Sequence, residues 1–215
     1  MTSDSIKGVF GKNEKGRIAV LIEDHFDQTE FENFNVYFPA HGYQVVYMSH
    51  LWGQPSLFFR GNPDDGEIRS SVTVETELAT SDPADYRGFL LIGAYAMDRL
   101  RYEASPKKGQ PNGAPAVELM RRVMRSPGVK VGTICHAMWL LCADRALLEG
   151  RRVTCAHNIV CDVANAGAEV VFEGDATAEL IVDGDLISGK HPGVVARFMD
   201  VFRAEIESTK GVSHG

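Results

Sequence analysis

A cysteine and a histidine stand side by side at Cys135-His136, where an apolar run gives way to an amphipathic one. Residues 129–134 are short, apolar and β-branched, which predicts a buried strand, and residues 137–148 predict a helix. A side chain in such a strand-turn-helix lies at the carboxyl end of the strand, beside the unpaired N–H groups of the helix start. Because those groups favour negative charge, we expect Cys135 to be a nucleophilic thiol with a depressed pKa.

The residues alone leave a second interpretation of Cys135 open. Free cysteines are among the most buried residues, so Cys135 is equally well explained as a small core residue. The other three cysteines, Cys142, Cys155 and Cys161, form no C-x-x-C pair. We expect free thiols, as in a reducing compartment.

The elements that must position Cys135 alternate between strands and helices. Strands are expected at residues 17–22, 43–48 and 88–92, and helices at residues 29–40 and 114–124. This alternation predicts a mostly parallel sheet with helices on both faces. Ligands of such folds bind beyond the carboxyl ends of the strands, where Cys135 is expected.

The C-terminal third continues the pattern with shorter elements. We expect strands at 152–155 and 169–172, a helix at 159–166, a hairpin of 179–182 with 186–188, and a closing amphipathic helix at 192–207. Two stretches rich in turn formers, residues 52–71 and 102–113, interrupt the alternation. Long loops of this kind are often lids or interfaces.

Composition bounds the class of protein. The 215 residues carry a formal net charge of −7, with 44% hydrophobic and 24% charged residues, as in ordinary globular domains. We expect one domain over residues 17–208, with flexible segments at 1–16 and 209–215. No apolar run approaches the roughly 18 residues that span a bilayer and no signal-peptide core is visible, so we expect a cytoplasmic protein without a membrane partner. The acidic balance lacks the basic stripe that nucleic-acid binding requires.

No motif calls for a cofactor or a metal. Neither a G-x-x-x-x-G-K-[ST] phosphate loop nor a G-x-G-x-x-G fingerprint occurs. Cys155, His157 and Cys161 are separated by one and three residues, which is no zinc spacing, so packing is the favoured role. His25 and His191 lie in loops near predicted strand ends, where each either lines the site or is a solvated surface histidine.

The chain resembles the ThiJ/PfpI superfamily, which has a class I glutamine amidotransferase-like fold, over about residues 17–202. The family's A-x-C-H-G turn is matched by residues 133–137 (TICHA), and residues 148–154, 165–168 and 182–188 resemble later family blocks in the right order. The resemblance implies a flavodoxin-like three-layer α/β sandwich with Cys135 as its nucleophile. It also implies a homodimer or a higher homo-oligomer.

A second matching segment supplies the acidic partner of the cysteine. Residues 24–30 (DHFDQTE) resemble the family segment D-G-F-E-D-x-E, which places Glu30 at that position. A carboxyl beside a thiolate resists ionisation, so Glu30 would donate a hydrogen bond to sulfur and move protons during turnover. Without the resemblance, Glu30 is an ordinary acidic residue in the first turn of a helix.

A third segment, residues 93–99 (GAYAMDR), matches the family's G-G-x-A-P-E-R. The match implies that Gly93 and Ala94 belong to the oxyanion loop, and that Asp98 takes the acidic position which another subunit contributes in peptidase members. His136 would complete that catalytic group, although its place directly after the cysteine makes base catalysis within one subunit awkward.

Two departures from the family pattern lie near the pocket. Ala94 and Ala137 replace family glycines; both are small, so backbone donors are kept while the pocket changes shape. The expected catalytic residues are Cys135, Glu30 and His136. The expected substrate-binding residues are Gly93, Ala94, Asp98, His157 and His191.

These residues imply a cofactor-independent cysteine enzyme that acts on a small electrophile. The leading activity is one that the resemblance implies, the family's glyoxalase III-like conversion of 2-oxoaldehydes to 2-hydroxy acids without glutathione. Carbonyl addition by a thiolate needs only an acid and an oxyanion site. The alternatives are a hydrolase or hydratase at carbon-nitrogen bonds, of the amidase, peptidase or isonitrile hydratase type, and a redox sensor whose cysteine oxidises without turnover.

Overall fold

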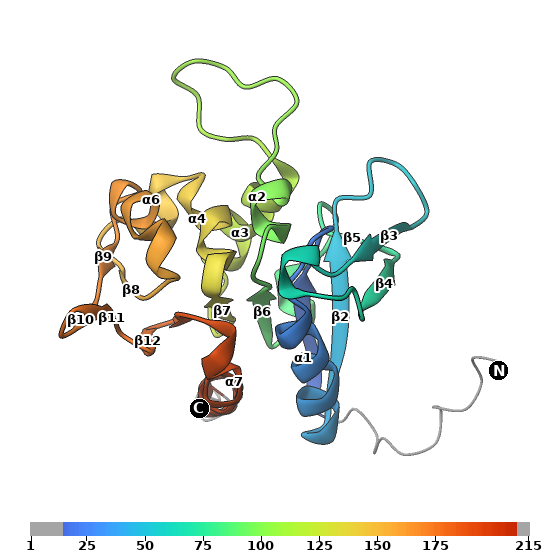
Figure 1. The fold of residues 1–215 in the computed structure, drawn as a ribbon. Helices are drawn as coiled ribbons and strands as arrows, with labels where there is room; N and C mark the ends of the chain where they lie inside the picture. The colour runs from blue at the N-terminus through green and yellow to red at the C-terminus, as the bar shows by residue number, and fades with distance from the viewer. Residues whose placement is uncertain (1–14, 210–215) are drawn as a thin grey trace, which may run out of the picture.

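The computed structural model describes residues 15–209, which are built around a seven-stranded sheet (Figure 1). The flexible segments expected at 1–16 and 209–215 lie outside these residues, apart from Lys15, Gly16 and Thr209. All neighbouring strands of the sheet are parallel except the pair at one edge, β12 and β13. In spatial order the strands are β12 (Leu180–Asp183), β13 (Leu186–Gly189), β7 (Lys130–Ile134), β6 (Gly88–Leu91), β1 (Gly16–Leu21), β2 (Tyr43–Ser49) and β5 (Thr76–Glu77).

Helices cover both faces of the sheet, which confirms the predicted flavodoxin-like α/β sandwich. The helices α1 (Gln28–Ala40) and α7 (Val195–Ser208) contact each other on one face. On the other face lie α2 (Ala96–Leu100), α3 (Pro115–Val123) and α4 (Trp139–Cys142), which also contact one another. Right-handed crossovers between parallel strands produce this division.

Two glycines let α7 pack directly on the sheet. A Cβ at Gly88 would stand 2.7 Å from the Phe202 ring, and one at Gly132 would stand 2.8 Å from the Phe198 ring. Both phenylalanines are fully buried, as is Phe38 of α1, whose ring meets Phe202 edge-on at 6.1 Å. The two helices are therefore held close beneath the strands that carry the cysteine turn.

The segment after β7 differs from the single helix expected at 137–148. It consists of a 3-10 turn, η3 (Cys135–Met138), followed by α4 and by a separate helix, α5 (Arg145–Leu148). Asp144 caps α5 through a hydrogen bond that its side chain accepts from the Ala146 N–H. Because an N-cap residue has non-helical backbone, Asp144 ends one helical segment and starts the next.

The remaining elements are short. The stretch at 52–71 contains a strand, β3 (Leu57–Arg60), which pairs with β4 (Ser71–Val74) outside the main sheet. The strands expected at 152–155 and 169–172 shrink to the two-residue strands β8 (Arg152–Val153) and β9 (Glu169–Val170). A small hairpin follows, β10 (Phe172–Glu173) with β11 (Ala176–Thr177), and α6 (Val160–Asn165) packs near β9. The single turns are η1 (Pro63–Asp65), η2 (Pro83–Asp85), η4 (His157–Ile159) and η5 (Pro192–Val194).

No helix within residues 15–209 is long and apolar enough to cross a membrane.

Candidate active site

Cys135 lies on a sharp turn at the carboxyl end of β7. Its φ is 57°, in the left-handed region that residues other than glycine rarely adopt, and Ile134 before it is extended. Strained backbone of this kind aims a nucleophile out of the sheet toward a ligand. Cys135 is 8% exposed and lines a cavity of about 470 Å³. It lies at the carboxyl end of its strand, where the strand-turn-helix pattern predicted it.

Glu30 occupies the third position of α1, where it is fully buried. Asp27, the N-cap residue, accepts a hydrogen bond from the Glu30 N–H at 2.9 Å. In an ordinary capping box the glutamate would accept the N–H of the N-cap residue in return. Here the backbone of Gly93 supplies both partners instead: its N–H donates to Glu30 Oε2 at 2.6 Å, and its carbonyl accepts the Asp27 N–H at 3.3 Å. This exchange turns the Glu30 carboxyl toward the cysteine turn.

The carboxyl of Glu30 and the thiol of Cys135 lie next to each other across Gly93. A Cβ at position 93 would stand 2.6 Å from Glu30 Oε1 and 3.1 Å from Cys135 Cβ. The absence of a side chain at this residue is therefore what allows the acid and the thiol to meet.

The electrostatics of Cys135 differ from the sequence-based expectation. Burial raises the pKa of the thiol, the negative charges of Glu30 and Asp27 raise it further, and the His136 and Ala94 N–H groups act in the opposite direction. The expected depressed pKa is therefore wrong, because the carboxyls and the buried site outweigh the donors of a short 3-10 turn. Simultaneous ionisation of the thiol and the Glu30 carboxyl is therefore disfavoured.

The donors that face the sulfur come from Ala94 and His136, since both backbone N–H groups form hydrogen bonds with Cys135. The Gly93 N–H, which the sequence assigned to the oxyanion loop, is already occupied by Glu30. Ala94 has φ 56°, a conformation in which glycine is strongly favoured. Its substitution for the family glycine thus keeps the donor in place under local strain.

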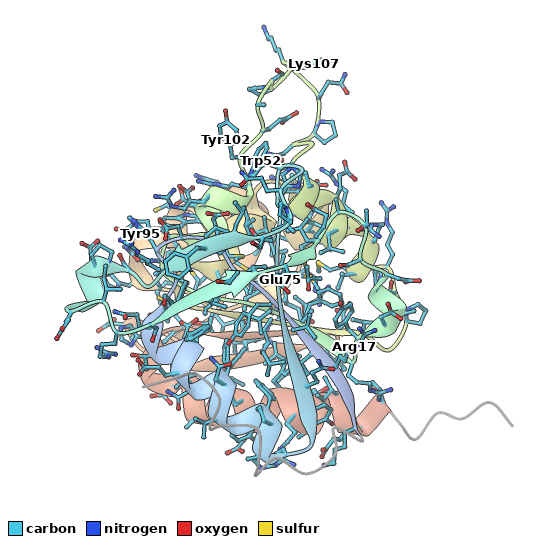
Figure 2. The ribbon with its side chains drawn as sticks, turned by 90° about the vertical axis from the view of Figure 1, so that its right-hand side faces the viewer. Arg17, Trp52, Glu75, Tyr95, Tyr102 and Lys107 are labelled. Carbon is cyan, nitrogen blue, oxygen red and sulfur yellow. The ribbon has the colours of Figure 1, made fainter. Side chains whose placement is uncertain are left out.

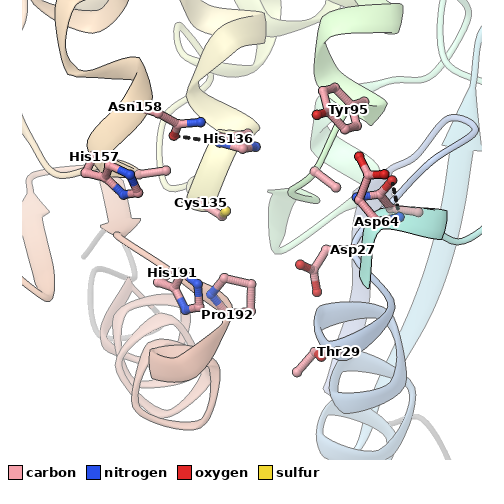
Figure 3. Close-up of a pocket in the computed structure, with 13 residues that line it drawn as sticks. Asp27, Thr29, Asp64, Tyr95, Cys135, His136, His157, Asn158, His191 and Pro192 are labelled. Carbon is pink, nitrogen blue, oxygen red and sulfur yellow. Dashed lines mark hydrogen bonds between the residues drawn. The ribbon is translucent and has the colours of Figure 1, made fainter. Parts of the chain in front are cut away.

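The His136 side chain interacts with Asn158 and Trp139 rather than with the Cys135 thiol. Its Nε2 lies 2.8 Å from Asn158 Oδ1, and its ring stacks on Trp139 at 4.8 Å between centroids. The Trp139 indole donates in turn to Asp162 at 2.9 Å. These contacts hold the imidazole on the wall of the cavity (Figure 3).

His157 and His191 lie on the wall to one side of the Cys135 sulfur, and Asp27 and Thr29 lie on the opposite wall (Figure 3). Both histidine side chains are exposed, and His191 Nδ1 accepts the Gly193 N–H at 3.0 Å. The Ala156 N–H donates to the Cys135 carbonyl at 3.3 Å, which fastens the segment before His157 to the cysteine turn. The structure thus places both histidines at the cavity, and their role in substrate binding stays a prediction.

Asp98 lies elsewhere. It pairs with Arg101, whose Nε donates to Asp98 Oδ1 at 2.8 Å, and it lines a separate cavity with Trp52 and Tyr102. The following loop, with Lys107 near its tip, projects away from the sheet and adds no residue to the Cys135 cavity (Figure 2). Within one chain, therefore, Asp98 does not meet the thiol.

The other cysteines and His25 are placed apart from the reactive turn. Cys142 packs against the core, Cys155 is fully buried, and burial raises the pKa of each thiol to about 12. Cys161 is exposed, and His25 lies beside Asp24 at 3.6 Å rather than in the cavity. Among residues 15–209, no three His, Cys, Asp or Glu side chains are grouped as a metal ion would require.

Among the cavity residues that the sequence analysis missed are Asp27, Asn158 and Tyr95. The pattern Asp27-x-x-Glu30 is a helix N-terminus signature and would have singled out Asp27 as the N-cap. No local signal identifies Asn158 or Tyr95, because their place depends on how distant segments pack.

Known proteins are similar to this chain over most of its length. A protein-family model described as the DJ-1/PfpI family matches residues 16–205. "Protein/nucleic acid deglycase 2" of Escherichia coli is 28% identical over 183 residues, which cover 85% of this chain and 92% of that protein. "Deglycase PfpI" of Pyrococcus furiosus is 29% identical over 178 residues, or 80% and 92% of the two chains.

Solved structures share the fold. A two-domain protein of Anabaena variabilis, with DJ-1/ThiJ/PfpI-like and ferritin-like domains, has a TM-score of 0.74 at 23% identity; the match covers 89% of this chain and 48% of that one. A ThiJ/PfpI domain protein of Brachyspira murdochii has a TM-score of 0.72 at 15% identity, covering 92% and 99%. The chain belongs to the DJ-1/PfpI family.

Proposed function

We propose that the chain is a cofactor-independent cysteine enzyme that converts 2-oxoaldehydes to 2-hydroxy acids. The observation that carries the proposal is the approach of the buried Glu30 carboxyl to Cys135, which lines the cavity, across Gly93. A thiol beside a carboxyl supplies a nucleophile and a proton-transfer group together.

The first step is addition of sulfur to the aldehyde carbon. The thiol proton passes to the Glu30 carboxylate as Cys135 attacks, and Glu30 delivers it to the aldehyde oxygen, which gives a hemithioacetal. The N–H groups of Ala94 and His136, which lie at the sulfur, stabilise negative charge on that oxygen as it develops.

The second step moves hydrogen between the two carbons. Glu30, now a carboxylate, removes the proton of the former aldehyde carbon and returns it to the neighbouring keto carbon, while the hydroxyl proton passes to the second oxygen. The product is a thioester of the 2-hydroxy acid. The aldehyde carbon is oxidised and the keto carbon reduced, so no external oxidant or reductant is consumed.

Hydrolysis completes the cycle. Water cleaves the thioester, the hydroxy acid leaves, and Cys135 recovers its proton. The net reaction adds one water molecule to the oxoaldehyde.

The test is turnover of methylglyoxal to lactate, and of glyoxal to glycolate, without glutathione. The wild-type protein should form both products, and Cys135→Ser should form neither above the uncatalysed rate, whereas Cys161→Ser should behave as the wild type. Equal rates for wild type and Cys135→Ser would overturn the proposal.

Removal of glycation adducts is a second candidate, because the two relatives described above are named deglycases. The same thiolate chemistry applies if the oxoaldehyde arrives as an adduct of an amine or thiol. The two activities can be told apart with a preformed methylglyoxal adduct of an acetylated amino acid. A scavenger in the assay removes free aldehyde, so that only the adduct remains as a substrate. Release of the free amino acid faster than in the Cys135→Ser variant would favour deglycation, and release at the spontaneous rate would favour action on the free aldehyde.

A carbon-nitrogen hydrolase has weaker support. Acyl transfer requires a base within hydrogen-bond reach of the nucleophile, and His136 is hydrogen-bonded to Asn158 and stacked on Trp139.

A further inference from the structure

A second cavity, of about 600 Å³, adjoins the one that contains Cys135. The two share Ala156, His157 and His191 in their walls. His157 and His191 face the Cys135 sulfur from one side (Figure 3), so the second cavity begins directly behind them. Neither the nucleophile nor Glu30 lines this second space, which makes it a place for a part of the ligand that does not react.

Hydrogen bonds connect the walls of the second cavity to the turn at Cys135. The β10–β11 hairpin contributes Phe172 and Thr177, and the Thr177 hydroxyl donates to the Cys155 carbonyl at 3.2 Å. The N–H of the next residue, Ala156, donates a hydrogen bond to the Cys135 carbonyl at 3.3 Å. A ligand held against the hairpin is therefore held at a fixed position relative to the sulfur.

The lining combines apolar and polar side chains. Phe172, Val160 and Ala176 supply apolar surface, and Lys190 and Asp175 carry opposite charges. Phe172 is 51% exposed, so its ring is accessible to a ligand in the cavity. An uncharged apolar group gains about 25 cal/mol for each Å² of apolar area removed from water at such a wall.

The size of the combined space argues for a substrate larger than methylglyoxal. Pockets of roughly 300–1,000 Å³ hold drug-sized ligands. A three-carbon aldehyde would fill only a part of the 470 Å³ around Cys135 and would leave the adjoining space empty.

We propose that the second cavity is a subsite for an apolar group, aryl or branched alkyl, that is attached to the keto carbon of the 2-oxoaldehyde. The proposal rests on the proposed function and names its substrate class. His157 and His191 flank the passage between the reacting carbonyls and this apolar group, and Phe172 covers the group from the hairpin.

The kinetic test compares phenylglyoxal, assayed by mandelate formation, with methylglyoxal, assayed by lactate formation. The wild type should have the higher kcat/KM for phenylglyoxal. Phe172→Ser should lower that value by about tenfold while kcat/KM for methylglyoxal stays within twofold, because only the larger substrate reaches the hairpin. Phe58→Ser is the matched control, since Phe58 is also an exposed phenylalanine of a short strand and lines neither cavity. An unchanged ratio of the two substrates in Phe172→Ser would overturn the subsite.

A binding test does not depend on turnover. Cys161 is exposed and lines the second cavity, so its alkylation by iodoacetamide, followed by peptide mass spectrometry, reports occupancy. Phenylglyoxylate should slow the alkylation of Cys161 severalfold in the wild type and not in Phe172→Ser, and pyruvate should not slow it in either. Equal effects of the two acids, or no effect of either, would contradict the subsite. Protection by phenylglyoxylate in a protein that turns over neither aldehyde would support the subsite and reject the proposed function.

Discussion

Glu30 and Cys135 approach each other over a residue that has no side chain. A Cβ at Gly93 would stand 2.6 Å from Glu30 Oε1, closer than real Cβ contacts, and 3.1 Å from Cys135 Cβ. The backbone of Gly93 binds both residues: its N–H donates to Glu30, and its carbonyl accepts the Asp27 N–H. One backbone segment thus positions the acid, the N-cap and the nucleophile together.

The first prediction concerns Gly93→Ala. The methyl group would displace the Glu30 carboxyl, and a displacement of about 1 Å at a reacting group costs roughly 10²-fold in rate. We expect kcat for methylglyoxal to fall by at least that factor, while circular dichroism shows a folded protein. Gly113→Ala is the control, because a Cβ there meets only the end of the Glu103 side chain, at 3.2 Å. Wild-type turnover in folded Gly93→Ala would show that the spacing between carboxyl and thiol is not critical.

The second prediction concerns the pKa of Cys135. The charge of Asp27 raises that pKa, so Asp27→Asn should lower it and shift the pH profile of Cys135 alkylation toward lower pH. Asparagine is a good N-cap, so α1 should be kept. Asp64→Asn provides the control: Asp64 lines the same cavity but is not among the groups that shift the Cys135 pKa. A shift toward higher pH in Asp27→Asn, measured with iodoacetamide and peptide mass spectrometry, would contradict this account of the charge balance.

The third prediction concerns stability. Ala94 holds φ 56°, and a left-handed backbone costs an alanine about 1–2 kcal/mol, whereas glycine adopts it without that cost. The greater freedom of glycine in the unfolded chain offsets about 0.4–1 kcal/mol of the gain. Urea unfolding of Ala94→Gly should therefore show a free energy of unfolding higher by up to about 1 kcal/mol. Ala164→Gly, in α6, should be less stable by about 1 kcal/mol, as expected for glycine inside a helix. A loss of stability in Ala94→Gly would mean that its side chain makes contacts worth more than the strain.

The fourth prediction is a homodimer or a higher homo-oligomer. Asp98 does not meet Cys135 within one chain, and the exposed rings of Trp52 and Tyr102 lie 6.1 Å apart beside it (Figure 2). Light scattering at micromolar concentration should give at least twice the chain mass of 23.6 kDa. A monomer mass under these conditions would contradict the assembly.

Strands and helices with strong local signals could be predicted from the sequence. Residues 17–22 and 43–48 are short apolar runs, and β1 and β2 form there, with the helix α1 between them. The turn at Cys135 was likewise visible, because a strand pattern ends there and a helical pattern follows. These features depend on neighbours in the sequence, which is why the residues alone identify them.

What the sequence could not show depends on tertiary packing. The direction of the Cys135 pKa shift follows from its burial beside two carboxyls of α1, which no local pattern reveals. The use of the Gly93 N–H by Glu30 likewise arises from two segments 63 residues apart. The second cavity depends on a hairpin of two-residue strands, too short to be recognised as strands from their pattern.

The most direct measurement of the central claim is lactate formation from methylglyoxal by Glu30→Gln. Glutamine retains the acceptor for the Gly93 N–H but has no proton to transfer, so we expect turnover to fall by roughly two to four orders of magnitude in a folded protein. Glu32→Gln, on the same helix but exposed and paired with Arg69, should keep the wild-type rate. An unchanged rate in folded Glu30→Gln would remove Glu30 from the mechanism and contradict the role of the Glu30–Cys135 pair.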